Sequence, residues 1–129
     1  MGCVDATLES SRRVRVLVAD DDVHVRSALR LVLEQEVDMQ VVGESAAADG
    51  LLAEVVRSSA GVVLLDWELP GLRDDGLVAR LRAAEPKLRL VAMSGRPEQR
   101  SEALCAGMDA FVCKGDAPET LLGTLRALQ

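Results

Sequence analysis

Short apolar runs alternate with amphipathic segments five times along the chain, and this alternation limits the possible folds more than any other feature. The runs lie at Val14–Ala19, Met39–Gly43, Val62–Leu65, Leu88–Met93 and Ala110–Cys113. Continuous apolar runs of this length are typical of strands in a parallel sheet that is covered on both faces. The alternation therefore predicts an α/β fold.

The segments between the runs carry apolar residues at helical spacing. They predict helices at 25–33, 51–56 and 77–81, a fourth opened by Pro97 and closed by Gly107, and a fifth from Asp116 to about Leu128. We expect Asp116 to cap the fifth helix and Glu119 to reach back to its start. Five strand–helix units predict a flavodoxin-like, doubly wound parallel sheet of five strands in the order 2-1-3-4-5, with five helices.

Length and charge narrow the class of protein. The 129 residues suit one domain, which we expect at 14–129 after a polar, flexible leader at 1–13. A net charge of -6 without a basic cluster argues against nucleic-acid binding by this chain. No apolar run is long enough for a membrane span, and three cysteines without ligand spacing suit a reducing compartment, so we expect a cytoplasmic protein.

Polar residues gather where the predicted strands end. Asp20 and Asp21 follow the first strand, Asp66 the third, Ser94 the fourth and Lys114 the fifth. In an open parallel sheet these ends line the functional crevice. Clustered carboxylates without histidine or cysteine suit a hard divalent cation, for which we favour Mg²⁺. A carboxylate beside such an ion can act as a nucleophile towards phosphorus and form an acyl phosphate.

Four sequence pieces at these strand ends resemble the receiver domains of two-component response regulators. They are VLVADDD (16–22), LLDWELPG (64–71), VAMSG (91–95) and GMDAFVCK (107–114). The resemblance covers roughly residues 13–128. It is nearest to the receivers of helix-turn-helix transcriptional regulators, because Gly115 follows Lys114 where many receivers have proline.

The resemblance implies a function for the acidic residues. Asp66 would accept a phosphoryl group from a sensor histidine kinase or a phosphotransfer protein. Asp21 and Asp66 would bind Mg²⁺ directly, Asp20 would bind it largely through water, and the backbone carbonyl of Glu68 would complete the shell. The domain would assist its own phosphorylation and dephosphorylation without being an enzyme in the usual sense.

The resemblance also implies a switch. Ser94 and Lys114 would contact phosphoryl oxygens, and Ser94 with Phe111 would repack the surface formed by the fourth helix, fifth strand and fifth helix. That surface would control a homodimer, a downstream protein or an output domain, such as a DNA-binding domain outside this chain. The alternative is a degenerate receiver that acts as a protein-interaction module without phosphorylation, and the segment at 71–75, about two residues longer than usual, keeps it open.

Several neighbouring residues have expected places. We expect Asp22 to cap the first helix, Glu68 and Arg96 to pair across the mouth of the site, and Trp67 to be half-exposed beside it. The peptide bond between Lys114 and Gly115 is expected to be trans, because a cis bond without proline costs about 3 kcal/mol.

Two other classes of protein use a similar sheet. A haloacid-dehalogenase-like phosphatase needs Asp-x-Asp-x-Thr/Val after the first strand, whereas residues 20–24 read DDDVH. A flavodoxin needs a hydroxyl-rich or glycine-rich loop there to bind phosphate, and three aspartates would repel it. Both alternatives are disfavoured.

Overall fold

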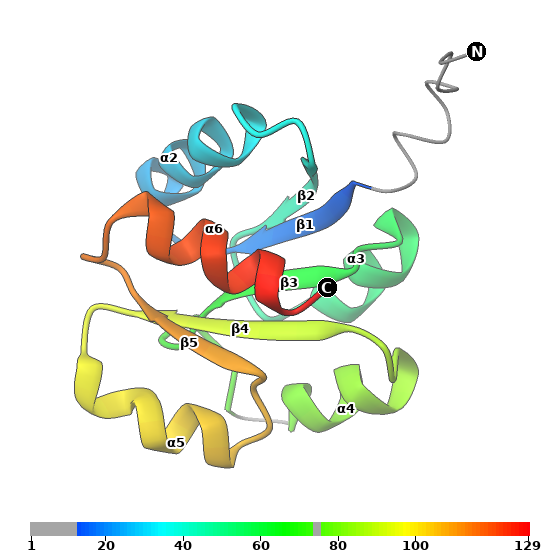
Figure 1. Ribbon diagram of the computed structural model, residues 1–129. Coiled ribbons are helices and arrows are strands. Elements are labelled where there is room, and N and C mark those ends of the chain that lie inside the picture. The colour runs from blue at the N-terminus through cyan, green and yellow to red at the C-terminus, as the bar shows by residue number, and fades with distance from the viewer. Residues whose placement is uncertain (1–12, 74–75) are drawn as a thin grey trace.

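The computed structural model describes residues 13–73 and 76–129, and the described chain forms a sheet covered by helices on both faces (Figure 1). The strands are β1 (Val14–Ala19), β2 (Met39–Ser45), β3 (Val62–Asp66), β4 (Arg89–Ser94) and β5 (Ala110–Cys113). The helices are α2 (Val23–Glu34), α3 (Leu51–Ser58), α4 (Leu77–Ala84), α5 (Arg100–Cys105), which follows the 3-10 turn η1 (Pro97–Gln99), and α6 (Pro118–Ala127).

The sheet is parallel throughout, and its strands lie in the order β2-β1-β3-β4-β5. The predicted flavodoxin-like order and the five helices of the described chain are therefore confirmed. Of the predicted leader at 1–13, only Arg13 is among the described residues, so the prediction of a flexible leader lies almost wholly outside the part of the chain that the structure describes. No helix of the described ranges has the length and apolar character needed to cross a membrane.

Successive residues of the central strands face opposite sides of the sheet, as the pleat requires. In β1, Leu17 and Ala19 pack into the core under α3, α4 and α5, whereas Val16 and Val18 pack into the core under α2 and α6. Both cores are fully apolar at these positions. This two-sided burial explains why the strands are continuous apolar runs rather than alternating ones.

Helix ends agree with the sequence in two places and differ in one. Asp22 caps α2 by accepting a hydrogen bond from the backbone N–H of His24 at 2.8 Å. Gly107 follows α5 with φ of +110°, a left-handed conformation that glycine adopts without strain. The predicted cap of α6 is wrong. The N-cap is Ala117, without a side-chain cap, because the Asp116 carboxylate instead accepts from the Cys113 N–H at 3.1 Å.

Two strands extend to the residues that carry the polar chemistry. Asp66 is the last residue of β3 and pairs with Met93 of β4, while Ser94 is the last residue of β4 and pairs with Cys113. Both side chains are therefore carried by hydrogen-bonded strands rather than by loops. A site on strands keeps its geometry better than one on loops.

Candidate functional site

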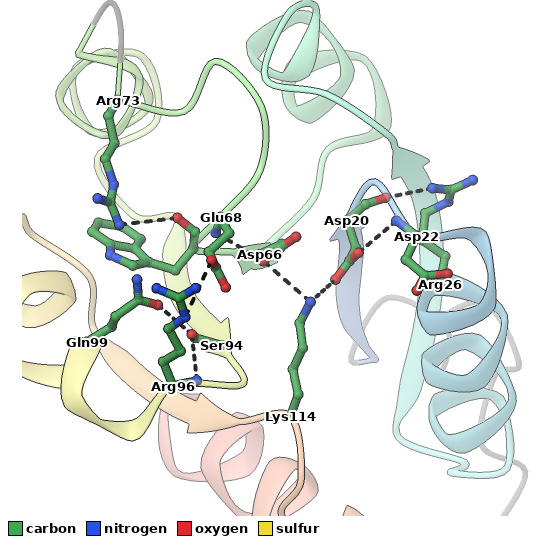
Figure 2. A network of polar contacts seen from close by, with 11 residues as sticks. Asp20, Asp22, Arg26, Asp66, Glu68, Arg73, Ser94, Arg96, Gln99 and Lys114 are labelled. Carbon is green, nitrogen blue, oxygen red and sulfur yellow. Dashed lines mark hydrogen bonds and ion pairs between the residues drawn. The ribbon is translucent and has the colours of Figure 1, made fainter.

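The polar residues singled out in the sequence meet at one edge of the sheet (Figure 2). Asp20 directly follows β1, Asp66 ends β3, Ser94 ends β4 and Lys114 follows β5. Because all the strands run in the same direction, their carboxyl ends lie side by side at this edge. The sheet order places β3 between β1 and β4, so Asp66 lies at the centre of the group.

Asp20, Asp21 and Asp66 form an acidic cluster whose carboxylate oxygens lie within 4.8 Å of one another. Asp20 and Asp66 are buried and Asp21 is exposed. The buried pair is held in place by backbone N–H groups, since Asp20 accepts from Asp22 at 2.9 Å and Asp66 accepts from Glu68 at 3.0 Å. The cluster opens towards solvent on the Asp21 side.

Arg26 of α2 fixes the backbone of the cluster from behind. Its guanidinium donates to the carbonyl oxygen of Asp20 at 2.6 Å and to the carboxylate of Glu44 at 3.0 Å. These contacts join the start of α2 to the end of β2, with Asp20 between them. The sequence showed Arg26 near the aspartates but gave no reason to expect this role.

Lys114 reaches back across the sheet edge to the aspartates. Its Nζ lies 2.8 Å from Asp20 and 3.4 Å from Asp66. Burial alone would lower the pKa of Lys114, but its contacts with the two carboxylates outweigh burial and raise it. The lysine is therefore a cation at neutral pH.

The environment of Asp66 disfavours a negative charge. Burial is the main cause, and the nearby charge of Asp20 adds to it, so the pKa of Asp66 is raised despite the Glu68 N–H and Lys114. A divalent cation would relieve this repulsion. The donors of the cluster are all carboxylate oxygens, which is the set that Mg²⁺ prefers, so these residues fit the predicted ion.

The Ser94 hydroxyl is fully buried and engaged with its own loop. It donates to Oε1 of Gln99 at 2.5 Å and accepts from the backbone N–H of Arg96 at 3.0 Å. In Figure 2 the hydroxyl lies on the Gln99 and Arg96 side, whereas Lys114 points at the aspartates. The sequence predicted Ser94 at this edge but not the part of Gln99.

Glu68 and Arg96 face each other at the mouth of the site, as predicted. Their closest charged atoms lie 3.9 Å apart, and both side chains are largely exposed. An exposed pair at this distance contributes little to stability. The Glu68 side chain is directed to Arg96, and only its backbone N–H contacts the acidic cluster.

Trp67 is buried, with 3% of its surface exposed, so the expectation of a half-exposed ring is wrong. The indole N–H donates to Glu102 of α5 at 2.7 Å, and Arg73 lies over the ring, 5.1 Å from its centroid, while pairing with Glu102 at 2.8 Å. Arg73 thus covers the ring, which also belongs to the apolar core on that side of the sheet.

Two further expectations concern the end of β5. Phe111 is buried at 5% exposure, under Arg100, whose guanidinium lies 5.9 Å from the ring centroid. The role of Phe111 in a switch stays a prediction. The bond between Lys114 and Gly115 is trans, as predicted, because the described chain contains no cis peptide.

Comparison with known proteins decides the family. The sequence profile of the response regulator receiver domain family matches residues 16–126, which include every residue of the site. The chain belongs to this family. This receiver is thus a signalling domain of two-component systems rather than an enzyme in the usual sense.

Relatives in sequence include transcriptional regulators. Response regulator RppA of Synechocystis sp. is 36% identical over 121 residues, covering 90% of this chain and 50% of that protein. The transcriptional regulatory protein YxjL of Bacillus subtilis is 27% identical over 117 residues, covering 89% of this chain and 54% of that protein. The receiver spans about half the length of these curated relatives.

Solved structures agree with the fold. The isolated REC domain of RcsB from Salmonella enterica serovar Typhimurium, determined with the phosphomimetic BeF3⁻, superposes with a TM-score of 0.79 at 28% identity, covering 91% of this chain and 88% of that chain. RcsB of the same organism bound to promoter rprA gives a TM-score of 0.80 at 27% identity, covering 91% and 62%. The expected nearness to receivers of transcriptional regulators is confirmed.

Proposed function

We propose that this receiver accepts a phosphoryl group on Asp66 from a sensor histidine kinase or a phosphotransfer protein, in a Mg²⁺-dependent reaction. One observation carries the proposal. At the carboxyl edge of the sheet, Asp66 lies beside two further carboxylates and the Lys114 ammonium group. A structural aspartate at a strand end needs neither a second buried carboxylate nor a lysine.

The transfer is a substitution at phosphorus. A carboxylate oxygen of Asp66 forms a bond to phosphorus, and the bond between phosphorus and the imidazole nitrogen of the donor breaks. The nitrogen keeps the bonding electron pair and takes up a proton, while Asp66 becomes an acyl phosphate. Burial raises the pKa of Asp66, whereas the neighbouring Lys114 lowers it and so favours the ionised form that attacks phosphorus.

Protein groups and an ion share the stabilisation of charge. Asp20, Asp21, Asp66 and the backbone carbonyl of Glu68 would hold Mg²⁺, which when bound neutralises charge on the phosphoryl oxygens. Lys114 already contacts Asp66 at 3.4 Å and would pair with a phosphoryl oxygen. The same groups would assist hydrolysis of the acyl phosphate.

Phosphorylation would alter the surface formed by α5, β5 and α6. The Ser94 hydroxyl would turn to the phosphoryl group, and Phe111 would move with it, repacking α5, β5 and α6. This surface would bind a second copy, a downstream protein or an output domain. We expect cytoplasmic signalling, with any contact to DNA made by another domain and none to a membrane.

Beryllium fluoride binding tests the proposal. With Mg²⁺ present, the wild type should bind the phosphoryl mimic, and Trp67 fluorescence should report it, because the indole adjoins Asp66 in the chain. Asp66→Asn should abolish the response. Asp22→Asn is the matched control, since it removes a nearby acidic charge while asparagine still caps α2. Binding by Asp66→Asn equal to wild type would refute the proposal and favour an unphosphorylated interaction module.

A further inference from the structure

The Ser94 hydroxyl can donate one hydrogen bond, and in this structure Oε1 of Gln99 accepts it. The donor and acceptor oxygens are 2.5 Å apart, and the Arg96 N–H fixes the hydroxyl from another side at 3.0 Å. Ser94 is 0% exposed, so in this structure its hydroxyl depends on protein groups for its hydrogen bonds. A hydroxyl in this position has no proton left for a phosphoryl oxygen.

Gln99 is placed for this contact by the turn that follows β4. Pro97 begins the 3-10 turn η1, and the Gln99 N–H donates back to the Arg96 carbonyl at 3.0 Å. The turn brings the Gln99 side chain back beside Ser94, at the end of β4 (Figure 2). Gln99 does not contact the acidic cluster, whose partners are Lys114 and backbone N–H groups.

We propose that Gln99 is a positioning residue that restrains the receiver in its unphosphorylated state. It competes with the phosphoryl group for the hydrogen bond that the Ser94 hydroxyl donates. This inference rests on the proposed phosphorylation of Asp66. When a phosphoryl group is present, Ser94 exchanges a neutral acceptor for an anionic one, which forms the stronger hydrogen bond. Before phosphorylation, Gln99 is the better partner because it satisfies a buried donor.

The competition has a consequence that mere packing would not produce. Removal of the Gln99 acceptor leaves the buried hydroxyl unsatisfied only in the unphosphorylated state. The phosphomimetic state, in which Ser94 donates elsewhere, is unaffected. Variants that lack the acceptor therefore bind the mimic more tightly, although they have lost a hydrogen bond.

Two variants remove the acceptor in different ways. Gln99→Met keeps the length of the side chain without its amide, and Gln99→Asn keeps an amide that is too short to reach Ser94. Affinity for beryllium fluoride, measured by ¹⁹F NMR at saturating Mg²⁺, should rise roughly two- to tenfold in both, the factor that one hydrogen bond supplies. The affinity for Mg²⁺ alone should equal that of the wild type in both.

A double-mutant cycle shows whether Gln99 acts through Ser94. In the Ser94→Ala background, Gln99→Met should leave the affinity for the mimic unchanged. An equal rise with and without Ser94 would overturn the inference, as would unchanged or weaker binding in both single variants. If the wild type itself binds no mimic and acquires no phosphoryl group on Asp66, the proposed function fails and this inference fails with it. Wild-type binding with no effect at Gln99 overturns only the inference.

Discussion

At the scale of single residues, the site gathers three carboxylates and one ammonium group. Lys114 is closer to Asp20 than to Asp66, at 2.8 Å against 3.4 Å. Removing the Asp66 charge would therefore leave Lys114 paired with Asp20 and would relieve the repulsion inside the cluster. Unless a divalent cation is bound, the charged Asp66 carboxylate therefore lowers the stability of the fold, and the proposed phosphorylation requires that carboxylate.

We predict that Asp66→Asn melts a few degrees above the wild type at pH 7 in the presence of EDTA. The raised pKa of Asp66 means that the folded protein binds a proton more readily than the unfolded chain. Stability from this group is therefore fully present below its unfolded pKa and is lost as pH rises through the folded pKa. The advantage of the variant should shrink as pH falls from 7 towards 4. Thermal unfolding checks this, and a lower melting temperature at pH 7 would contradict it.

Trp67 provides a second prediction at this scale. Glu102→Ala leaves the buried indole N–H without its acceptor and frees Arg73, and we expect a loss of about 1–2 kcal/mol of unfolding free energy. Glu102→Gln keeps an acceptor for the indole and should cost less. Urea unfolding followed by tryptophan fluorescence measures both, and equal costs would mean that the hydrogen bond does not matter.

The sequence predicted which residues meet at the site but not how their side chains pair. Asp20, Asp66, Ser94 and Lys114 were found because strand ends converge. The burial of Trp67 was missed because its partner Glu102 lies 35 positions away on α5. Gln99 was missed because nothing in the pattern indicates where a turn residue directs its amide.

At the scale of elements, apolar periodicity predicted all five strands, with ends displaced by at most two residues. The displacements have a physical cause. Asp66 and Ser94 stay in the ladder because neighbouring strands pair with them, although polar residues usually indicate a strand end. The cap of α6 was mispredicted because Asp116 had two N–H partners available, and the one at Cys113 prevailed.

Helix α6 allows buried and exposed contributions to be compared at adjacent positions. Leu125 is fully buried, whereas Arg126 pairs with Glu36 and Asp38 near the surface. Leu125→Ala should cost about 2–5 kcal/mol because it opens a cavity between the helix and the sheet. Arg126→Ala should cost much less, and that cost should fall further in high salt. Chemical unfolding at two salt concentrations checks both, and a larger cost at Arg126 would contradict this ranking.

At the scale of the whole molecule, one sheet with helices on both faces brings four strand ends to a single acidic edge. This follows from the alternating pattern of the sequence together with the geometry of parallel sheets. In the sequence, the segment 71–75 is longer than usual, which kept the alternative of an unphosphorylated module open. Residues 74–75 lie outside those that the structure describes.

A ligand that binds only the folded protein stabilises the whole domain. We therefore predict that millimolar Mg²⁺ raises the melting temperature of the wild type and does not raise that of Asp20→Asn or Asp66→Asn to the same extent. Asp22→Asn, whose carboxylate is outside the cluster, should respond like the wild type. An equal response in all four proteins would place the ion elsewhere.

The most direct test of the central claim is the intact mass of the protein after incubation with acetyl phosphate and Mg²⁺. The account predicts a gain of one phosphoryl group in the wild type and in Asp22→Asn, and none in Asp66→Asn or without Mg²⁺. Peptide mapping should locate the group on Asp66. No gain in the wild type, or a gain that persists in Asp66→Asn, would contradict the assignment of Asp66 as the phosphoacceptor.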